Sequence, residues 1–194
     1  LLDPGIGVFG TKGASVHVQE VTRALRADGH QVTVFCTRTD EHVPADLADL
    51  EVRRHRLPKG KGAERERAVA EVVSRHGGFD VLVNNAGFGA SGLFTEQHPD
   101  RLQAMIALDV AAVVDLSRAF LDRLTAAPGG VLVNVASVLA YQPAPRMAVY
   151  AAAKAFVLSF SEALHEEVRD RGVRVTAEVT PHHLMLTDEK LATY

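Results

Sequence analysis

Three side chains in the second half of the chain have types and a spacing that suit proton transfer. Tyr150 and Lys154 are four positions apart, so on a helix they lie on one face. An ammonium beside a phenol favours the phenolate, which predicts a Tyr150 pKa below the usual value of about 10 and makes the phenol a usable acid or base. Ser137 lies thirteen positions before Tyr150 and can hold a substrate oxygen beside the phenol. An ordinary amphipathic helix with a surface tyrosine and lysine is the alternative.

The elements that position these side chains are indicated by apolar runs. Residues 131–135, Val-Leu-Val-Asn-Val, predict a buried strand that ends just before Ser137. Residues 81–87, Val-Leu-Val-Asn-Asn-Ala-Gly, predict another buried strand that ends in a small, polar turn. Residues 147–171 predict a helix that carries both Tyr150 and Lys154. Strands and helices alternate along the chain, which predicts an α/β fold with a mostly parallel sheet.

The run Asn84-Asn85-Ala86-Gly87, Ser137 and the Tyr150/Lys154 pair resemble the short-chain dehydrogenase/reductase family, over residues 63–176. The resemblance implies a Rossmann-like parallel sheet with helices on both faces, an NAD or NADP cofactor, and hydride transfer to or from a carbonyl or alcohol carbon. It also implies that Tyr150 is the acid/base, that Lys154 tunes it and reaches the cofactor's ribose, and that Ser137 orients the carbonyl. The residues that would line the cofactor are Asn84, Ala86 and Gly87.

One catalytic position departs from that family's pattern. The family carries an asparagine in the middle of the long helix predicted over 99–124, and matching by position places Asp109 there. A carboxylate offers no N–H donor, and its charge near Lys154 draws the ammonium away from Tyr150. Two hypotheses therefore stay open: an NAD(P)-dependent oxidoreductase acting on a carbonyl or alcohol, active or inactive, and a catalytically inert Rossmann-like chimera or fragment.

The glycine-rich start of the chain has a different resemblance. Residues 1–57, with the run Gly10-Thr-Lys-Gly-Ala-Ser15, are similar to the amino-terminal domain of GT-B glycosyltransferases. This makes a nucleotide-sugar-binding module the third hypothesis. Backbone N–H groups at the start of the following helix can cradle a phosphate, so Gly10, Gly13 and Ser15 are candidate cofactor-binding residues, with a plain glycine turn as the alternative. Arg38, just past the strand predicted over 31–36, favours NADP slightly over NAD.

The end of the chain resembles a third family. Residues 175–194, with Thr180-Pro-His-His, are similar to dihydroorotase, a resemblance that implies a metal-ligand role for His182. One ligand does not make a zinc site, so no metal is predicted. The three resemblances predict a mosaic within one Rossmann-like domain over 1–194. Its parts are a glycosyltransferase-like 1–62, a dehydrogenase-like core at 63–176 and an unrelated tail at 177–194, with the first strand truncated.

Composition excludes several other classes of function. The chain has 194 residues, of which 47% are hydrophobic and 23% charged, with a net charge of −3. These values are typical of a globular protein and give no reason to expect nucleic acid or an anionic membrane as a partner. The partner implied is a small carbonyl or alcohol substrate, and a homo-oligomer is compatible with the sequence. Cys36 is the only cysteine, so a reducing cytoplasm is expected.

Overall fold

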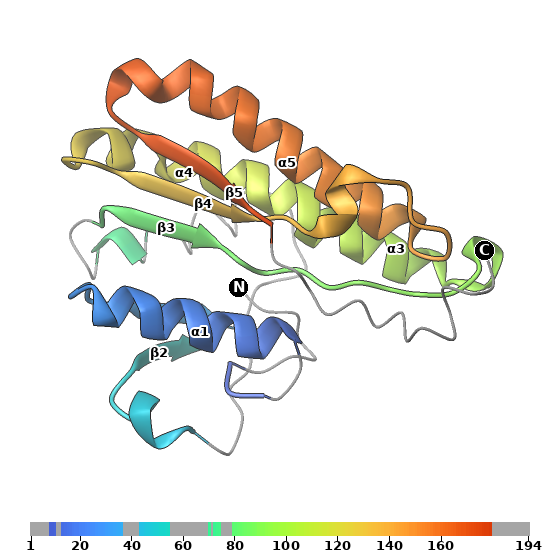
Figure 1. The fold of residues 1–194 in the computed structure, drawn as a ribbon, viewed down its shortest axis with the longest axis horizontal. Helices are drawn as coiled ribbons and strands as arrows, with labels where there is room; N and C mark the ends of the chain where they lie inside the picture. Colours follow the sequence, from blue (N-terminus) through green and yellow to red (C-terminus); the bar gives the residue numbers. More distant parts are fainter. Residues whose placement is uncertain are drawn as a thin grey trace.

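The computed structural model describes residues 8–10, 13–36, 43–54, 70, 72–74 and 79–179 (Figure 1). Within these ranges the structure contains both strands and longer helices. In order they are α1 Gly13–Ala27, β1 Thr33–Cys36, β2 Glu51–Arg54, β3 Val81–Asn84, α3 Pro99–Ile106, α4 Ala112–Ala126, β4 Val131–Val135, α5 Ala148–Val168 and β5 Arg174–Glu178. In this part of the chain no helix is both long enough and apolar enough to cross a membrane.

The strands are parallel, as the alternating pattern predicts. β1 pairs with β2, and β4 pairs on one side with β3 and on the other with β5. The hydrogen-bonded pairs thus form a two-stranded and a three-stranded sheet rather than one continuous sheet. In a doubly wound fold the first strand lies at the centre. The expected truncated first strand lies outside the described residues.

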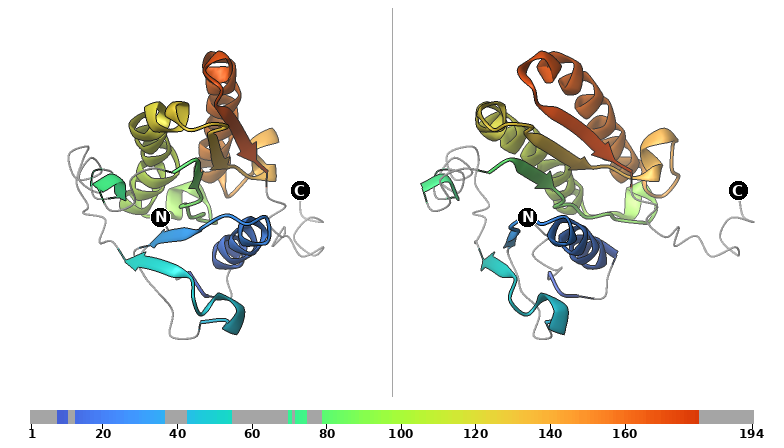
Figure 2. Two further views of the ribbon diagram at one scale, coloured as in Figure 1. Left: turned by 90° about the vertical axis from the view of Figure 1, so that its left-hand side faces the viewer. Right: turned by 60° about the vertical axis from the view of Figure 1, so that its left-hand side comes forward.

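Two helices cover one face of the three-stranded sheet. Asn84 of β3 and Asn134 of β4 are partners in the parallel register. Asn84 reaches Ser117 on α4, and Asn134 reaches Ser161 on α5. Side chains of register partners point to the same face, so α4 and α5 lie on the same side. The left view of Figure 2 shows α1 on the opposite side of the line of strands from α4, which gives helices on both faces.

The main core lies between this sheet and its two covering helices. Leu124 of α4 and Leu132 of β4 are fully buried there, packed with Val168 and Val175. A second core lies between α1 and the β1–β2 pair, around Cys36. Burial of apolar surface at about 25 cal/mol per Å² is the main force that fixes these helices on the strands.

The helix predicted over 99–124 is interrupted in the structure. Pro99 stands at its start, where a missing N–H costs nothing, and the His98 side chain accepts a hydrogen bond from Asp100 N at 3.2 Å. After α3 the residues Ala107–Ala111 form a π-helical turn before α4 continues. A π turn widens the helix locally, and such turns occur frequently at functional sites. Here it contains Asp109.

The helix predicted over 147–171 ends cleanly. α5 occupies Ala148–Val168, and a 3₁₀ turn Arg169–Arg171 follows it. Gly172 adopts a left-handed conformation with φ of 76°, which glycine accepts without steric cost. The chain therefore reverses into β5, whose last residue Glu178 lies opposite Val135 at the end of β4.

Candidate active site

Tyr150 and Lys154 lie one turn apart near the start of α5, and both are buried. Tyr150 packs against Leu102 and Met105 of α3, so its ring is held by a neighbouring helix rather than exposed to water. The alternative of a surface tyrosine and lysine on an ordinary amphipathic helix is therefore wrong. The face of α5 that carries Tyr150 and Lys154 points toward the protein interior.

Ser137 lies directly after β4 and begins a short 3₁₀ turn, Val138–Tyr141. Its hydroxyl accepts a hydrogen bond from Leu139 N at 3.3 Å, and the residue is buried. The Ser137 side chain also acts, as a hydrogen-bonding neighbour, to lower the pKa of the Tyr150 phenol. The structure thus places Ser137 and Tyr150 near one another at the carboxyl end of β4.

The Lys154 ammonium lies beneath the same end of β4. Its Nζ donates a hydrogen bond to the carbonyl of Val135 at 3.0 Å. The Asp109 Oδ2 atom is 3.6 Å from Nζ, and the Tyr150 ring centroid is 5.7 Å away. The ammonium is therefore held by a backbone carbonyl and a carboxylate, with the phenol ring as a more distant neighbour.

The expected lowering of the Tyr150 pKa is wrong. Burial raises the pKa of the Tyr150 phenol above its usual value; the Ser137 hydrogen bond opposes this rise and the Asp109 charge adds to it. Burial also lowers the pKa of the Lys154 ammonium, and the nearby Asp109 carboxylate acts to raise it again. Spacing along a helix predicts proximity, but it does not predict how far packing removes the pair from water.

Asp109 occupies a closely packed place within the π turn. Its Oδ1 atom accepts a hydrogen bond from Phe88 N at 3.1 Å, and the residue is fully buried. A Cβ atom on Gly87 would come within 3.0 Å of Oδ2, tighter than ordinary contacts. Glycine at this position therefore lets the turn after β3 approach Asp109, a packing role beside the cofactor-lining role expected for Gly87.

Asn84 belongs to a buried polar network that sequence reasoning missed. Its Nδ2 atom donates to Asn134 Oδ1 at 2.9 Å and to Ser117 Oγ at 3.3 Å. Asn134 Nδ2 in turn donates to Ser161 Oγ at 2.9 Å. The signal was present in the sequence, because residues 81–84 and 131–134 both read Val-Leu-Val-Asn. The Asn84 side chain is engaged by its neighbours inside the fold.

The candidate phosphate loop is described in part. α1 begins at Gly13, and Ser15 is buried. The Gly10 carbonyl accepts a hydrogen bond from Gln19 Nε2 at 3.0 Å, which ties the loop back to the helix. Arg38 and His182 lie outside the described residues. Within the described ranges no group of three metal-ligating side chains comes together.

A contact between α1 and β5 is a second feature that the sequence did not indicate. His17 Nε2 on α1 lies 3.6 Å from Glu178 Oε2 at the end of β5. Burial lowers the pKa of the His17 imidazole, the Glu178 carboxylate acts to raise it, and the charge of Lys154 acts to lower it. The charges of Glu178 and Lys154 therefore both act on the His17 imidazole.

The donors at this edge of the sheet fit a ligand rich in hydrogen-bond acceptors. Among the described residues, Asn85 Nδ2 and His17 Nε2 are buried and have no hydrogen-bond partner. Buried polar atoms without partners are uncommon in proteins, and here they accompany the ammonium of Lys154. Ligands of open α/β folds bind outside the carboxyl ends of the strands. A nicotinamide dinucleotide, with its phosphate, ribose and amide oxygens, fits this donor set.

Relatives of known class agree with this geometry. In the pig, dehydrogenase/reductase SDR family member 4 is 33% identical over 164 residues, which cover 80% of this chain and 57% of that protein. A metagenomic short-chain oxidoreductase in complex with NADP superimposes with a TM-score of 0.70 at 27% identity, covering 86% of this chain and 76% of that one. A 3-ketoacyl-(acyl-carrier-protein) reductase from Brucella melitensis, complexed with NADH, gives a TM-score of 0.71 at 26% identity, covering 82% and 69%.

The extent of these matches bears on the expected mosaic. The chain spans from 20% to 58% of the length of the curated relatives that it matches first. The family model for short chain dehydrogenases matches residues 17–188. That range enters both terminal segments in which the sequence resembled other families, and it contains Ser137, Tyr150 and Lys154. The chain belongs to the short-chain dehydrogenase family.

Proposed function

We propose that this chain carries the catalytic part of an NAD(P)-dependent oxidoreductase that interconverts a carbonyl and an alcohol. The observation that carries the proposal is the buried cluster of Ser137, Tyr150 and Lys154 at the end of β4, where Lys154 Nζ donates to the Val135 carbonyl and the Ser137 hydroxyl acts on the phenol. This arrangement offers a proton donor, a second hydroxyl and a fixed positive charge around one point. Those groups suit the stabilisation of a developing alkoxide.

Each side chain has a distinct task in the proposed reduction. The Ser137 hydroxyl donates a hydrogen bond to the carbonyl oxygen and fixes its direction. As a hydride adds to the carbonyl carbon, the C=O π electrons move to oxygen, and the Tyr150 phenol donates its proton to that oxygen. The resulting phenolate is stabilised by the Lys154 ammonium until a proton from water restores the phenol. A bound nicotinamide supplies the hydride in this direction and accepts it in the reverse.

Several other residues are proposed to hold the cofactor. Ala86 and Gly87 follow β3 and lie at the edge of the sheet where β4, the neighbour of β3, and β5, next to β4, also end. Gly10, Gly13 and Ser15 would serve as the phosphate loop, and Lys154 would also reach the ribose. Asn84 would act by positioning the turn after β3, because its side chain is engaged in the buried network. NADP is preferred over NAD in this proposal, because Arg38 would pair with a 2′-phosphate.

A second candidate, a catalytically inert member of the family, is favoured by one observation. Burial and the Asp109 charge both raise the pKa of Tyr150, which opposes formation of the phenolate.

The proposals of a mosaic origin, a cytoplasmic location and a homo-oligomer rest on the sequence pattern and the family alone. The relatives reported above do not support a nucleotide-sugar-binding role, and it enters only as an outcome of the binding test.

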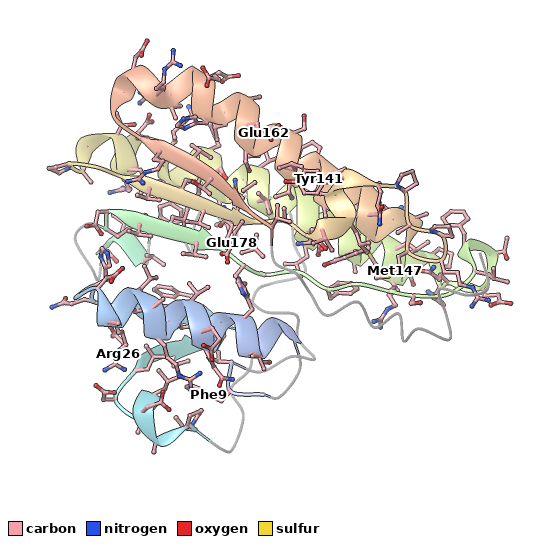
Figure 3. All side chains as sticks on the ribbon, in the orientation of Figure 1. Phe9, Arg26, Tyr141, Met147, Glu162 and Glu178 are labelled. Atoms are coloured by element: carbon pink, nitrogen blue, oxygen red, sulfur yellow. The ribbon has the colours of Figure 1, made fainter. Side chains whose placement is uncertain are left out.

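The test is the oxidation of NADPH in the presence of a panel of activated ketones, followed by absorbance. We expect turnover that Tyr150→Phe reduces by about a hundredfold or more, the contribution typical of a general acid. Tyr141→Phe is the matched control, because Tyr141 is 67% exposed on the turn after β4 and has no role in the mechanism (Figure 3). Equal activity of the Tyr150→Phe variant and the wild type would contradict the proposed chemistry.

A further inference from the structure

The His17–Glu178 contact joins two elements on either side of the proposed cofactor crevice. His17 belongs to α1, the helix that follows the candidate phosphate loop, and Glu178 is the last residue of β5. Figure 3 shows Glu178 at the end of β5 that faces α1. The backbone carbonyl of Glu178 accepts a hydrogen bond from Ala136 N at 2.8 Å, so the residue before Ser137 is tied to the same place. The contact therefore lies beside the catalytic cluster.

The charges at this point are unusual for the mouth of a site that takes a phosphate-bearing ligand. The Glu178 side chain brings a carboxylate to 3.6 Å from the imidazole of His17. The His17 side chain is only 12% exposed, whereas that of Glu178 is 39% exposed. Lys154, buried on α5, extends its positive charge to the same imidazole. A carboxylate is thus already present beside His17, a group that attracts an anionic ligand when it is protonated.

We propose that Glu178 is an internal competitor of the dinucleotide and determines its affinity. The carboxylate occupies the place beside His17 that an anionic or acceptor group of the cofactor would otherwise take, and the contact draws α1 toward the end of β5. Entry of the cofactor requires Glu178 to swing outward into water, which its exposure allows, and lets the ligand approach His17 Nε2, which has no hydrogen-bond partner among the described residues. This inference rests on the proposed function, because it concerns the same crevice.

The contact should strengthen in acid. Protonation of His17 turns a contact between a carboxylate and a neutral ring into an ion pair. The groups that face His17 from the elements packed against it are Glu178 from β5, whose charge favours protonation, and Lys154 from α5, whose charge opposes it. The competition from Glu178 should therefore grow as pH falls through the lowered pKa of His17, and fade above it.

The first experiment measures the affinity for NADPH by its fluorescence, using the whole chain and its Glu178→Gln variant. We expect the variant to bind about two- to fivefold more tightly at acidic pH, the size typical of a partly exposed ion pair, and the ratio to be smaller above the pKa of His17, where only the charge of the carboxylate opposes the ligand. Glu162→Gln is the matched control, since it removes the same charge from an exposed position on α5 far from α1 (Figure 3). It should leave the affinity unchanged.

A second measurement needs no cofactor. The pKa of His17, followed by NMR, should fall further in Glu178→Gln, because the carboxylate that favours protonation is gone, and should be unchanged in Glu162→Gln. An unchanged His17 pKa in Glu178→Gln, or equal NADPH affinities of wild type and variant at every pH, overturns the inference while leaving the proposed function intact. No binding of NADPH by any folded variant overturns the proposed function and, with it, the role of Glu178.

Discussion

Asp109→Asn removes the negative charge beside Lys154 and nearly preserves the shape of the side chain. The Asp109 charge acts to raise the pKa of Tyr150, and the carboxylate holds the Lys154 ammonium at 3.6 Å. Without that charge the pKa of Tyr150 falls toward its usual value, and the ammonium is released toward the phenol. We expect carbonyl reductase activity to rise about tenfold, a partial gain that stays below the factor of about 100 to 10,000 that a complete general-acid step contributes.

The size of this effect is compatible with the geometry. Unit charges at the 3.6 Å between Asp109 and Lys154 attract by about 5 kcal/mol at an effective dielectric constant of about 20. A tenfold change in rate corresponds to about 1.4 kcal/mol of activation free energy. A tenfold gain in rate therefore needs only about a third of the attraction between Lys154 and Asp109 to act instead between Lys154 and the Tyr150 phenolate.

The same substitution carries a cost in stability. It leaves the buried Lys154 ammonium without its counter-charge, a change that destabilises proteins by about 3–5 kcal/mol. We expect a value of about 3 kcal/mol, because asparagine keeps an acceptor for Phe88 N and Lys154 keeps the Val135 carbonyl. Asp28→Asn, on the exposed turn after α1, is the matched control and should change stability by less than about 0.5 kcal/mol.

The assay compares NADPH oxidation by wild type, Asp109→Asn and Asp109→Asn/Tyr150→Phe with activated ketones. Because Asp109 acts to raise the lowered pKa of Lys154, the variant loses the lysine proton at a lower pH than the wild type, and its gain in activity should shrink as pH rises. A folded variant that shows no gain at any pH, or a gain that survives Tyr150→Phe, would refute the reasoning. Urea unfolding of each variant establishes that it is folded.

Further predictions follow from contacts elsewhere in the site. Asn134→Ala removes one acceptor from Asn84 and one donor from Ser161, although Asn84 keeps Ser117 and Ser161 keeps the Val157 carbonyl, so urea unfolding should show a loss of about 1–3 kcal/mol, against a negligible change for Gln142→Ala on an exposed turn. Ser137→Ala removes a hydrogen bond that lowers the pKa of Tyr150, so tyrosine titration followed by NMR should show that pKa rising further. His17 has a folded pKa below its usual value of about 6.5, so the unfolded chain binds more protons between the two values. Stability should therefore fall as pH drops through that window, and His17→Gln should flatten the dependence measured by urea unfolding.

Local patterns predicted the elements that carry the site. The apolar run at 131–135 coincides with β4, and the helix predicted over 147–171 contains α5. The proximity of Ser137 to the face that carries Tyr150 also follows from such patterns, because a parallel strand and the helix after it meet at a fixed edge. The α/β fold class is confirmed by the parallel pairing and by the solved short-chain dehydrogenases that superimpose on the chain.

The features of the site that the sequence did not predict depend on contacts between residues far apart in the chain. The Tyr150 pKa rises because α3 packs over the phenol, and no pattern within α5 indicates that packing. The His17–Glu178 contact joins the first described helix to the last described strand, so neither residue carries a local sign of the other. Only the network of Asn84 and Asn134 left a signal in the sequence, as a repeated run of four residues.

The binding of NADPH to the folded chain, measured by calorimetry beside a uridine-diphosphate sugar, tests the central claim most directly. The claim is that the edge of the sheet holding Ser137, Tyr150 and Lys154 is a nicotinamide dinucleotide site. The account predicts saturable binding of NADPH and none of the nucleotide sugar. Binding of the nucleotide sugar alone, or binding of neither ligand by folded protein, would contradict it.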